Sequence, residues 1–460
     1  MAELRSDVAI VGGGIAGLSA AYALAKNGVS FLLLEAAQRF GGVIRSETVN
    51  GFLLEAGPDS ILAQKPEGIA LCRELGLGER LVPTNPVERA VYVLHRGRLH
   101  PLPEGMSLAV PTRIAPFLRS GLFSWPGKLR IGLDLVIPAR RGSDDESIAS
   151  FLGRRFGREA VARLGEPLLA GIHAGDPERL SIRATFPRFA DLEAGHGSLI
   201  RGLWAAPRPS GPPPAAFYSL RGGLGELVDA LVARLPASSM MKGRAVRTLA
   251  REASGLRLGL EGGDAVRARS VILAAPAPRL ASLLESLLPE AARTLAAIPF
   301  ASSATLLLGY RRQDVAHPLS GYGLVVPRTE GLRCSACSFF STKFPGRAPE
   351  GHVLLRVFLG GVRDPEVLAL DDAALTHIVQ EELRPVLGLR CAPVLARVYR
   401  WPGATPQMEV GHLERMAELE RRLAEIPGLI LTGAGIRVTG LPDTVAEGFR
   451  AAAAAQRAPG

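Results

Sequence analysis

Three glycines near the start of the chain have the spacing of a dinucleotide-binding turn. Gly12, Gly14 and Gly17 form a G-x-G-x-x-G pattern between an apolar run at 7–11 and an Ala- and Leu-rich run at 18–26. The first glycine permits a tight turn, the second lets the backbone approach a pyrophosphate, and the third lets a helix pack closely on a strand. The predicted helix would present free N–H groups and the positive end of its dipole to phosphates, with Ile15 and Ala16 in the same cofactor site.

The next apolar run, 29–34, ends at an acidic residue, Glu35. A carboxylate at this place can accept hydrogen bonds from ribose hydroxyls. Strand, glycine turn, helix and second strand together have about the length of one βαβ unit, roughly 30 residues. The pattern therefore predicts dinucleotide binding, and the alternative is a glycine-rich turn without a ligand.

The residues that follow extend this pattern. The segment 35–42 reads EAAQRFGG. It resembles the E-A-x-x-R-x-G-G signature of the flavin-containing amine oxidase superfamily, in which these residues surround FAD. The resemblance implies that Glu35, Ala36, Arg39, Gly41 and Gly42 contact the cofactor, with Arg39 balancing pyrophosphate charge. The alternative for Arg39 is a surface ion pair.

A second flavin segment lies near the C-terminus, where 433–443 reads GAGIRVTGLPD. The resemblance implies that a helix opening at Gly440 would face the flavin ring, and that helical N–H groups there would stabilise negative charge on the reduced ring. The last cysteine is Cys391, which precedes this segment, so the FAD is expected to be non-covalent. The remaining implied cofactor residues are Val246, Trp401, Gly433, Val438, Leu441 and Pro442.

Further motifs narrow the resemblance within the superfamily. They occupy 169–186, 197–202, 219–224, 344–351, 358–361 and 400–412. Together they resemble the family of oxygen-dependent protoporphyrinogen oxidases and coproporphyrinogen III oxidases, from residue 7 to about 453. The resemblance implies oxidation of protoporphyrinogen IX by oxygen in three two-electron steps of heme biosynthesis, with release of hydrogen peroxide. The alternatives are coproporphyrinogen III as substrate, an amine oxidase-like flavoenzyme, and a non-enzymatic, flavin-stabilised membrane scaffold.

The same resemblance implies a substrate pocket. Its floor would be the backbone from Gly171 to Gly175, its wall Leu324 or Val325, and Phe358 would stack on a pyrrole. The family holds a propionate with an arginine, and Arg89 is the nearest candidate here. We expect His173 to have a packing role, and the alternative is a role as general base. No catalytic side chain is assigned, because the flavin carries out the chemistry.

The expected fold class is α/β, with three parts. A Rossmann-like FAD-binding domain would comprise 1–88, 211–299 and 414–460. A mixed-sheet substrate-binding domain would comprise 89–93 and 300–413. An inserted α-helical domain of the membrane-binding type would comprise 94–210, and the Pro-rich run 207–214 would be a loop at its boundary.

Two amphipathic runs in the inserted part, 114–123 and 128–137, predict helices that lie on a membrane. Phe117 and Leu122 would belong to the apolar face of the first, Leu129 and Val136 to that of the second, and Trp125 would lie between the runs. Lys128, Arg130 and Asp134 would lie on the polar face. Anionic lipid would meet the basic residues Arg113, Arg119, Lys128, Arg130, Arg140 and Arg141. A further helix is expected over 144–163, capped by Ser143 or Asp144.

The composition of the chain excludes several classes of protein. The chain has 460 residues, a formal net charge of +10 and four cysteines, which is too few for a disulfide-built scaffold. No zinc-type spacing accompanies Cys334 and Cys337, so no metal site is expected. The basic residues form no block typical of nucleic-acid binding, and no apolar run reaches the ~20 residues needed to span a bilayer. Because the sequence has no secretory signal, we expect a cytoplasmic protein that is peripheral on the membrane. A homodimer and a transient contact with the next enzyme of the heme pathway are left open.

Overall fold

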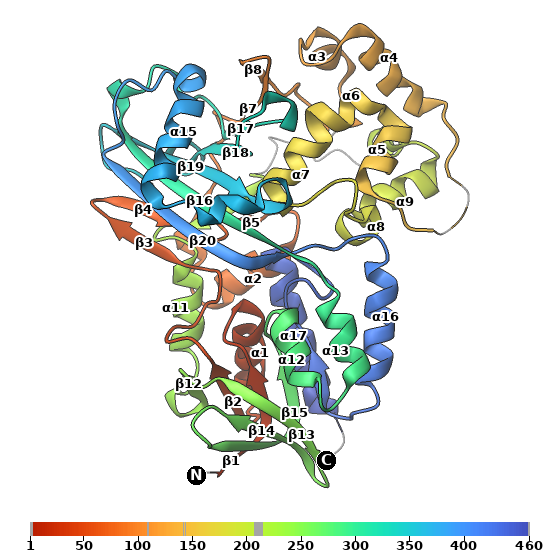
Figure 1. Cartoon of the computed structure of the whole chain (residues 1–460), viewed down its shortest axis with the longest axis vertical. Helices are drawn as coiled ribbons and strands as arrows, with labels where there is room; N and C mark the ends of the chain where they lie inside the picture. The colour runs from red at the N-terminus through yellow and green to blue at the C-terminus, as the bar shows by residue number, and fades with distance from the viewer. Residues whose placement is uncertain (1–2, 108–109, 141, 143, 207–214, 459–460) are drawn as a thin grey trace.

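The computed structural model describes residues 3–107, 110–140, 142, 144–206 and 215–458. Figure 1 shows an elongated molecule with a narrower half at the bottom and a broader half at the top. The upper half consists of a twisted sheet on the left of the view and a group of short helices on the right. The predicted loop 207–214 lies outside the described residues.

The lower half is built on a seven-stranded sheet in the order β12-β2-β1-β15-β14-β13, with β21 also paired to β15. The pairs β1/β2, β1/β15, β2/β12 and β15/β21 are parallel, whereas β13, β14 and β15 pair antiparallel. The strands are β1 (Glu3–Val11), β2 (Phe31–Glu35), β12 (Met240–Lys242), β13 (Val246–Glu252), β14 (Gly255–Leu260), β15 (Ala265–Leu273) and β21 (Leu429–Leu431).

Helices cover both faces of this sheet and bury its apolar strands. One face packs on α1 (Ile15–Lys26), α2 (Pro66–Glu74), α11 (Gly225–Ala233) and α17 (Leu441–Arg457). The other packs on α12 (Ala277–Leu284), α13 (Pro289–Ala296) and α16 (His412–Leu423). The helices α1 and α17 approach closely because Gly448 has no side chain: a Cβ there would lie 2.4 Å from the Ala16 carbonyl oxygen. This contact fixes the two helix N-termini relative to each other.

The upper sheet has seven strands in the order β20-β16-β19-β18-β17-β7-β8 and is mixed, because β7 pairs parallel with β17. Its strands are β7 (Val91–His95), β8 (Arg98–Pro101), β16 (Phe300–Arg311), β17 (Gly323–Val325), β18 (Ala336–Phe339), β19 (His352–Gly360) and β20 (Leu395–Pro406), and α15 (Asp372–Leu387) packs on it. Since β8 belongs to this sheet, the helical region begins after residue 101 and not at the expected residue 94. The smaller strands and helices are β3 (Ser46–Val49), β4 (Phe52–Glu55), β5 (Ile61–Leu62), β6 (Leu81–Pro83), β9 (Met106–Ser107), β10 (Val110–Pro111), β11 (Phe217–Leu220) and α14 (Phe340–Lys343).

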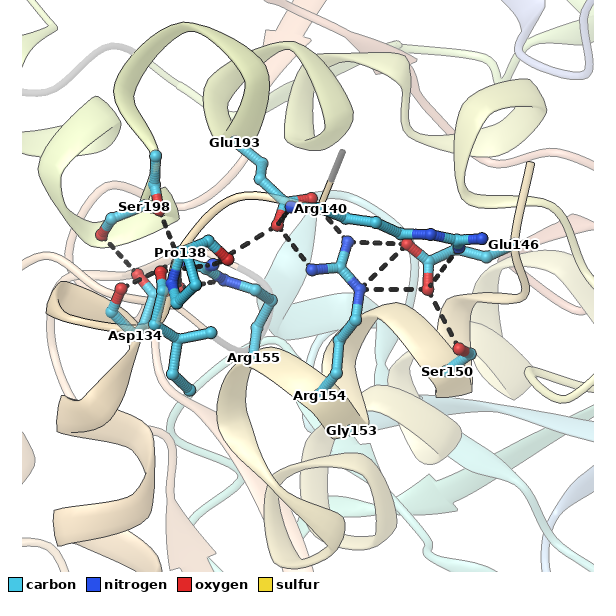
Figure 2. Close-up of polar contacts among 12 residues, drawn as sticks. Asp134, Pro138, Arg140, Glu146, Ser150, Gly153, Arg154, Arg155, Glu193 and Ser198 are labelled. Atoms are coloured by element: carbon cyan, nitrogen blue, oxygen red, sulfur yellow. Dashed lines mark hydrogen bonds and ion pairs between the residues drawn. The ribbon is translucent and has the colours of Figure 1, made fainter. Parts of the chain in front are cut away.

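The inserted region is helical and is held together by buried charge as well as by apolar packing. Arg155 and Asp134 are both fully buried and form an ion pair that also binds backbone of neighbouring helices (Figure 2). The helices are α3 (Ile114–Arg119), α4 (Trp125–Gly132), α5 (Ile148–Phe156), α6 (Arg158–Ala160), α7 (Glu166–His173), α8 (Ile182–Thr185), α9 (Pro187–His196) and α10 (Leu199–Ala205).

The helix expected over 144–163 is shorter than predicted. It begins at Ile148, where the Ser147 hydroxyl accepts a hydrogen bond from the Ser150 N–H at 3.1 Å. It ends at Phe156 because Gly157 adopts a φ of 89°, which α-helix does not allow. The cap is therefore Ser147 and not Asp144, and Ser143 lies outside the described residues.

The amphipathic runs are helical, but some residues predicted for the exposed polar face are buried. Phe117 and Leu122 are core residues at 5% and 0% exposure. Lys128 and Asp134, expected on the polar face, are buried because the Lys128 ammonium donates to the Leu118 carbonyl at 2.7 Å and Asp134 pairs with Arg155. Trp125 is the first residue of α4 and not a link between helices.

None of the helices in the described ranges combines the length and the apolarity that a crossing of the bilayer needs.

Candidate functional site

The turn between β1 and α1 is shaped by three glycines with different surroundings. Gly12 has a φ of +108°, and a Cβ there would lie 2.6 Å from the Ala274 carbonyl oxygen. A Cβ on Gly17 would lie 1.9 Å from the Gly12 carbonyl oxygen. A Cβ on Gly14 would meet no atom within 4 Å. Gly12 and Gly17 are thus required by packing, whereas Gly14 borders open space of the kind that a phosphate group would occupy.

The N-terminus of α1 faces this space without a protein partner for its charge. The cap residue, Gly14, supplies no side-chain hydrogen bond, and the first turn, which includes Ile15 and Ala16, holds no acidic residue. Free N–H groups and the positive end of the helix dipole favour an anion there. The geometry fits the pyrophosphate of a dinucleotide.

Glu35, at the end of β2, is fixed in place by backbone. Its Oε2 accepts a hydrogen bond from the Gly13 N–H at 2.6 Å, and its Oε1 accepts one from the Ala37 N–H at 2.7 Å. Each carboxylate oxygen keeps a further lone pair for an outside donor. The carboxylate is therefore aimed beside the glycine turn, where the sequence predicts a ribose.

Arg39 has a different local role from the one expected of it. Its guanidinium donates to the carbonyl oxygens of Phe40 at 3.2 Å, Ile44 at 3.0 Å and Gly42. These bonds hold a loop whose Gly41 N–H donates to the Gly13 carbonyl at 2.8 Å. Partial burial lowers the pKa of Arg39, and the described residues include no carboxylate bonded to it. Arg39 thus positions the loop against the glycine turn and leaves a positive charge near the predicted pyrophosphate.

The second flavin segment brings the N-terminus of α17 to a cavity. Gly440 caps the helix, and its carbonyl oxygen accepts a hydrogen bond from the Thr444 hydroxyl at 2.8 Å. Residues 439–443, which include Leu441 and Pro442, line the cavity. Upstream, Gly433 has a φ of +115°, and the Gly435 N–H donates to the Val438 carbonyl at 2.7 Å, which closes the loop before the helix.

The cavity has a volume of about 860 Å³ and lies where the three regions of the molecule meet. Its lining includes Gly57, Pro58 and Trp401 together with the start of α17. The indole N–H of Trp401 donates to the Ala56 carbonyl at 2.9 Å, which fixes the ring. The helical region and the upper sheet contribute further lining residues, among them Gly171, Phe186 and Phe358. An aromatic, mostly apolar lining of this size suits a large planar ligand next to a flavin.

A charged cluster that the sequence reasoning missed lies in the cavity wall. Asp59 pairs with the Lys343 ammonium at 3.2 Å and with the Arg356 guanidinium at 2.8 Å. These two cations hold the pKa of Asp59 below its usual range. Arg356 also donates to the Gly57 carbonyl, and its guanidinium carbon lies 4.6 Å from the centre of the Phe358 ring. Arg356 therefore positions two neighbouring parts of the cavity wall, the loop at Gly57 and the ring of Phe358.

His173 lines the cavity but is not charged there. Its ring stands edge-on to that of Phe186, with centres 5.6 Å apart. Desolvation lowers the pKa of His173 to about 4, so the imidazole is neutral near pH 7. A neutral ring can pack against apolar ligand surface and accept or donate one hydrogen bond.

Several predicted site residues are not among the described residues that line the cavity. The Arg89 guanidinium donates to the Pro86 carbonyl at 2.8 Å. Leu324 and Val325 are core residues at 2% and 8% exposure, because β17 packs them against neighbouring elements. Gly175 is buried beside the Gln407 side chain, and Val246 begins β13. The predicted wall and arginine are thus replaced by Phe186 and by charges from distant segments.

Comparison with known proteins places the chain in a family. The model of the flavin containing amine oxidoreductase family matches residues 15–456. The chain is 37% identical to the coproporphyrinogen III oxidase of Bacillus subtilis (strain 168), with 97% of each chain covered. It is 31% identical to the chloroplastic protoporphyrinogen oxidase of Nicotiana tabacum, with 93% of this chain and 81% of the relative covered.

Solved structures agree with this placement. A crystal structure of an Exiguobacterium sp. 255-15 protein, named for protoporphyrinogen oxidase, is similar with a TM-score of 0.86, 32% identity and 98% coverage of both chains. A putrescine oxidase variant shares the fold with a TM-score of 0.73, 19% identity and 99% coverage of both chains. The chain belongs to the flavin containing amine oxidoreductase family.

Proposed function

We propose that this protein oxidises coproporphyrinogen III to coproporphyrin III, with non-covalent FAD as cofactor and oxygen as electron acceptor. The observation that carries the proposal is the cavity, in which the second flavin segment, at the start of α17, borders a wide, aromatic-lined space with an excess of basic side chains. The names of the relatives support a porphyrinogen as the class of substrate.

The chain's own residues would bind and orient the reactants. The N-terminus of α1, Glu35 and the loop held by Arg39 would hold the dinucleotide part of FAD. The N-terminus of α17 would meet the ring. The chemistry that a bound flavin would supply is the removal of a hydride from a methylene bridge of the porphyrinogen. Arg356 keeps Phe358 in position beside the substrate, and the neutral His173 is suited to contact a pyrrole without adding charge.

The charge of the cavity favours the substrate with more carboxylates. The sequence alone led us to expect protoporphyrinogen IX. The cavity lining holds four basic side chains, Lys65, Arg188, Lys343 and Arg356, and two acidic ones, Asp59 and Asp443. An excess of positive charge attracts anionic ligands. We therefore place coproporphyrinogen III first and keep protoporphyrinogen IX as the second candidate.

The test is a fluorescence assay with purified protein. We expect a yellow protein that releases free FAD on denaturation, and we expect it to form porphyrin from coproporphyrinogen III faster than from protoporphyrinogen IX in air. The controls are the same assays without protein and with oxygen removed. Flavin-loaded protein that oxidises neither porphyrinogen would refute the proposed activity. A preference for protoporphyrinogen IX would refute the substrate assignment alone.

A second proposal concerns location: the helical region rests on the cytoplasmic face of a membrane. The observation in its favour is a set of large apolar side chains exposed on one run of the chain, 114–136. They are Ile114, Leu118, Trp125, Leu129, Leu133 and Val136. Exposed apolar residues gathered in this way are typical of a surface that binds a partner or a lipid phase.

A further inference from the structure

Arg188 has an unusual position among the charged residues of the cavity. It is the second residue of α9 and follows Pro187, directly after Phe186 at the corner between α8 and α9. Its side chain is exposed and lines the cavity. Within the described part of the chain it has no hydrogen bond or ion pair from its guanidinium, and the first turn of α9 contains no acidic side chain.

The other basic side chains of the cavity are already paired. Lys65 binds the Asp443 carboxylate. Lys343 and Arg356 share the carboxylate of Asp59 and are almost buried, with side-chain exposures of 14% and 5%. Their donors hold the cavity wall together, so a ligand would have to compete with these bonds. Arg188 is the cation whose donors are all available to a ligand from the described lining.

The surroundings of Arg188 fit a macrocycle that has an apolar face and acidic groups at its edge. Phe186 and Phe189 form the adjoining wall, with ring centres 6.0 Å apart, and both line the cavity. The aromatic rings offer apolar surface to a macrocycle, and the guanidinium offers two parallel N–H donors to a carboxylate. Phe186, Arg188 and Phe189 all line the same cavity, so one ligand can use both features at once.

We propose that Arg188 binds a carboxylate of the substrate and thereby selects acidic porphyrinogens. The inference rests on the proposed function, because it assumes a porphyrin-type ligand in the cavity. Arg188 would act as a specificity residue at the helical side of the cavity, away from the flavin segments. Arg89, which the sequence suggested for a propionate, is not among the described residues that line the cavity.

Equilibrium binding tests the inference without turnover. The probes are coproporphyrin III, which carries four carboxylates, and its tetramethyl ester, which carries none, both titrated in the same detergent by fluorescence. We expect Arg188→Gln to bind the acid about tenfold more weakly than wild type, because one charge-assisted contact is lost. The affinity for the ester should stay unchanged. Arg188→Lys should recover only part of the loss, since lysine keeps the charge without the planar pair of donors.

The control is Arg201→Gln. Arg201 is an exposed arginine on α10 of the same helical region and does not line the cavity, so its loss should leave both affinities unchanged. Equal binding of the acid by wild type and Arg188→Gln would overturn the inference while the proposed function stands. An equal loss of acid and ester binding would also overturn it, because packing and not charge would then explain the loss. Wild-type protein that binds neither probe would overturn the proposed function together with the inference.

Discussion

Glu55 is a buried acid whose ionisation opposes folding. It ends β4 and is fully buried. Its Oε2 accepts a hydrogen bond from the Ser46 hydroxyl at 2.6 Å, and its Oε1 accepts one from the Leu224 N–H at 2.7 Å. Burial raises its pKa to about 7, although these bonds act in the opposite direction. The carboxyl group ties the β3–β4 hairpin to the segment before α11.

The stability of the protein should therefore contain a pH-dependent contribution from Glu55. In the unfolded chain this carboxyl loses its proton near its ordinary pKa, whereas the folded protein keeps it up to about pH 7. The folded state binds more protons in that interval, so the free energy of unfolding falls as the pH rises from about 4.5 to 7. The size of the effect is on the order of 3 kcal/mol.

We expect Glu55→Gln to remove most of this slope, because an amide keeps the contacts without titrating. Urea unfolding at pH 5, 6, 7 and 8 measures it. Glu67→Gln is the control, because Glu67 is exposed in the first turn of α2. A slope in Glu55→Gln equal to that of wild type would show that Glu55 does not carry the dependence.

At the scale of single residues, the sequence predicts the position of a side chain when its partners lie within the same short segment. The glycine turn, Glu35 and the start of α17 are where the motifs place them, because each motif fixes its own backbone. The cluster of Asp59, Lys343 and Arg356 combines segments almost 300 positions apart in the chain. A cluster of this kind cannot be predicted from the spacing of residues within one segment. The cluster forms because α14, which ends at Lys343, and β19, which contains Arg356, both lie against the loop after β4 that contains Asp59.

Among the elements, the helices of the helical region are joined by buried ion pairs, in which Arg155 meets both Asp134 and Glu193. The Arg155 guanidinium donates to Asp134 Oδ1 at 2.6 Å and to the Gly197 carbonyl at 2.9 Å (Figure 2). The other carboxylate oxygen of Asp134 accepts hydrogen bonds from the Ser198 hydroxyl at 2.6 Å and the Ile200 N–H at 2.9 Å. The pair thus joins the turn after α4 to α5 and to the segment that begins α10.

Removal of one partner should destabilise this region strongly. Arg155→Met leaves the Asp134 carboxylate buried without its cation, which costs about 3–5 kcal/mol in comparable pairs. We expect a lower midpoint of thermal unfolding, and a partial recovery in the double variant Arg155→Met/Asp134→Asn, because no unpaired charge then remains. Arg158→Gln, an exposed change on the neighbouring α6, is the control and should have little effect. Unfolding of Arg155→Met at the wild-type temperature would contradict this account.

The same pair explains why the amphipathic pattern of 114–137 misled the sequence analysis. Hydrophobic periodicity places charged residues outside unless a partner satisfies them inside. Here Asp134 meets Arg155, and the Lys128 ammonium meets a carbonyl at the end of α3 and lies 4.6 Å from the centre of the Trp125 ring. Charged residues therefore occupy the inner face, and Leu129 and Val136 are turned outward. The existence of helices was predictable, but their orientation was not.

Over the whole molecule, the cavity depends on all three regions at once. The lower half contributes the start of α17, the upper sheet contributes Phe358 and Trp401, and the helical region contributes Gly171 and the corner at Phe186. The glycine turn before α1 and the helix that begins at Leu441 were predictable from the motifs. The lining was predictable only where a motif itself forms the wall, because the remaining wall arises from the packing of the regions against each other.

The outward apolar residues define the surface that should meet a membrane. Trp125, Leu129 and Val136 are 66%, 72% and 71% exposed, and Arg119 is exposed nearby. Burial of each apolar side chain in the lipid phase contributes about 1.5–3 kcal/mol when complete. Tryptophan is favoured at the headgroup boundary, and arginine near an anionic headgroup adds about 1 kcal/mol. Together these contributions are large enough for reversible binding to an anionic bilayer.

We expect the wild-type protein to sediment with vesicles that contain anionic lipid more than with neutral vesicles. Replacement of Trp125, Leu129 and Val136 by Ser should release it, and the bound flavin and the melting temperature should be unchanged because these side chains are outside the core. Val87, Val394 and Leu413 are also exposed but lie elsewhere, at 82%, 46% and 44%, and their replacement by Ser is the control that should keep binding. Equal sedimentation of the two triple variants, or a wild-type protein that stays in the supernatant at low salt, would exclude this surface as a membrane contact. Phe117 and Leu122 are unsuitable for the experiment, since their removal would open the core and release the protein by unfolding.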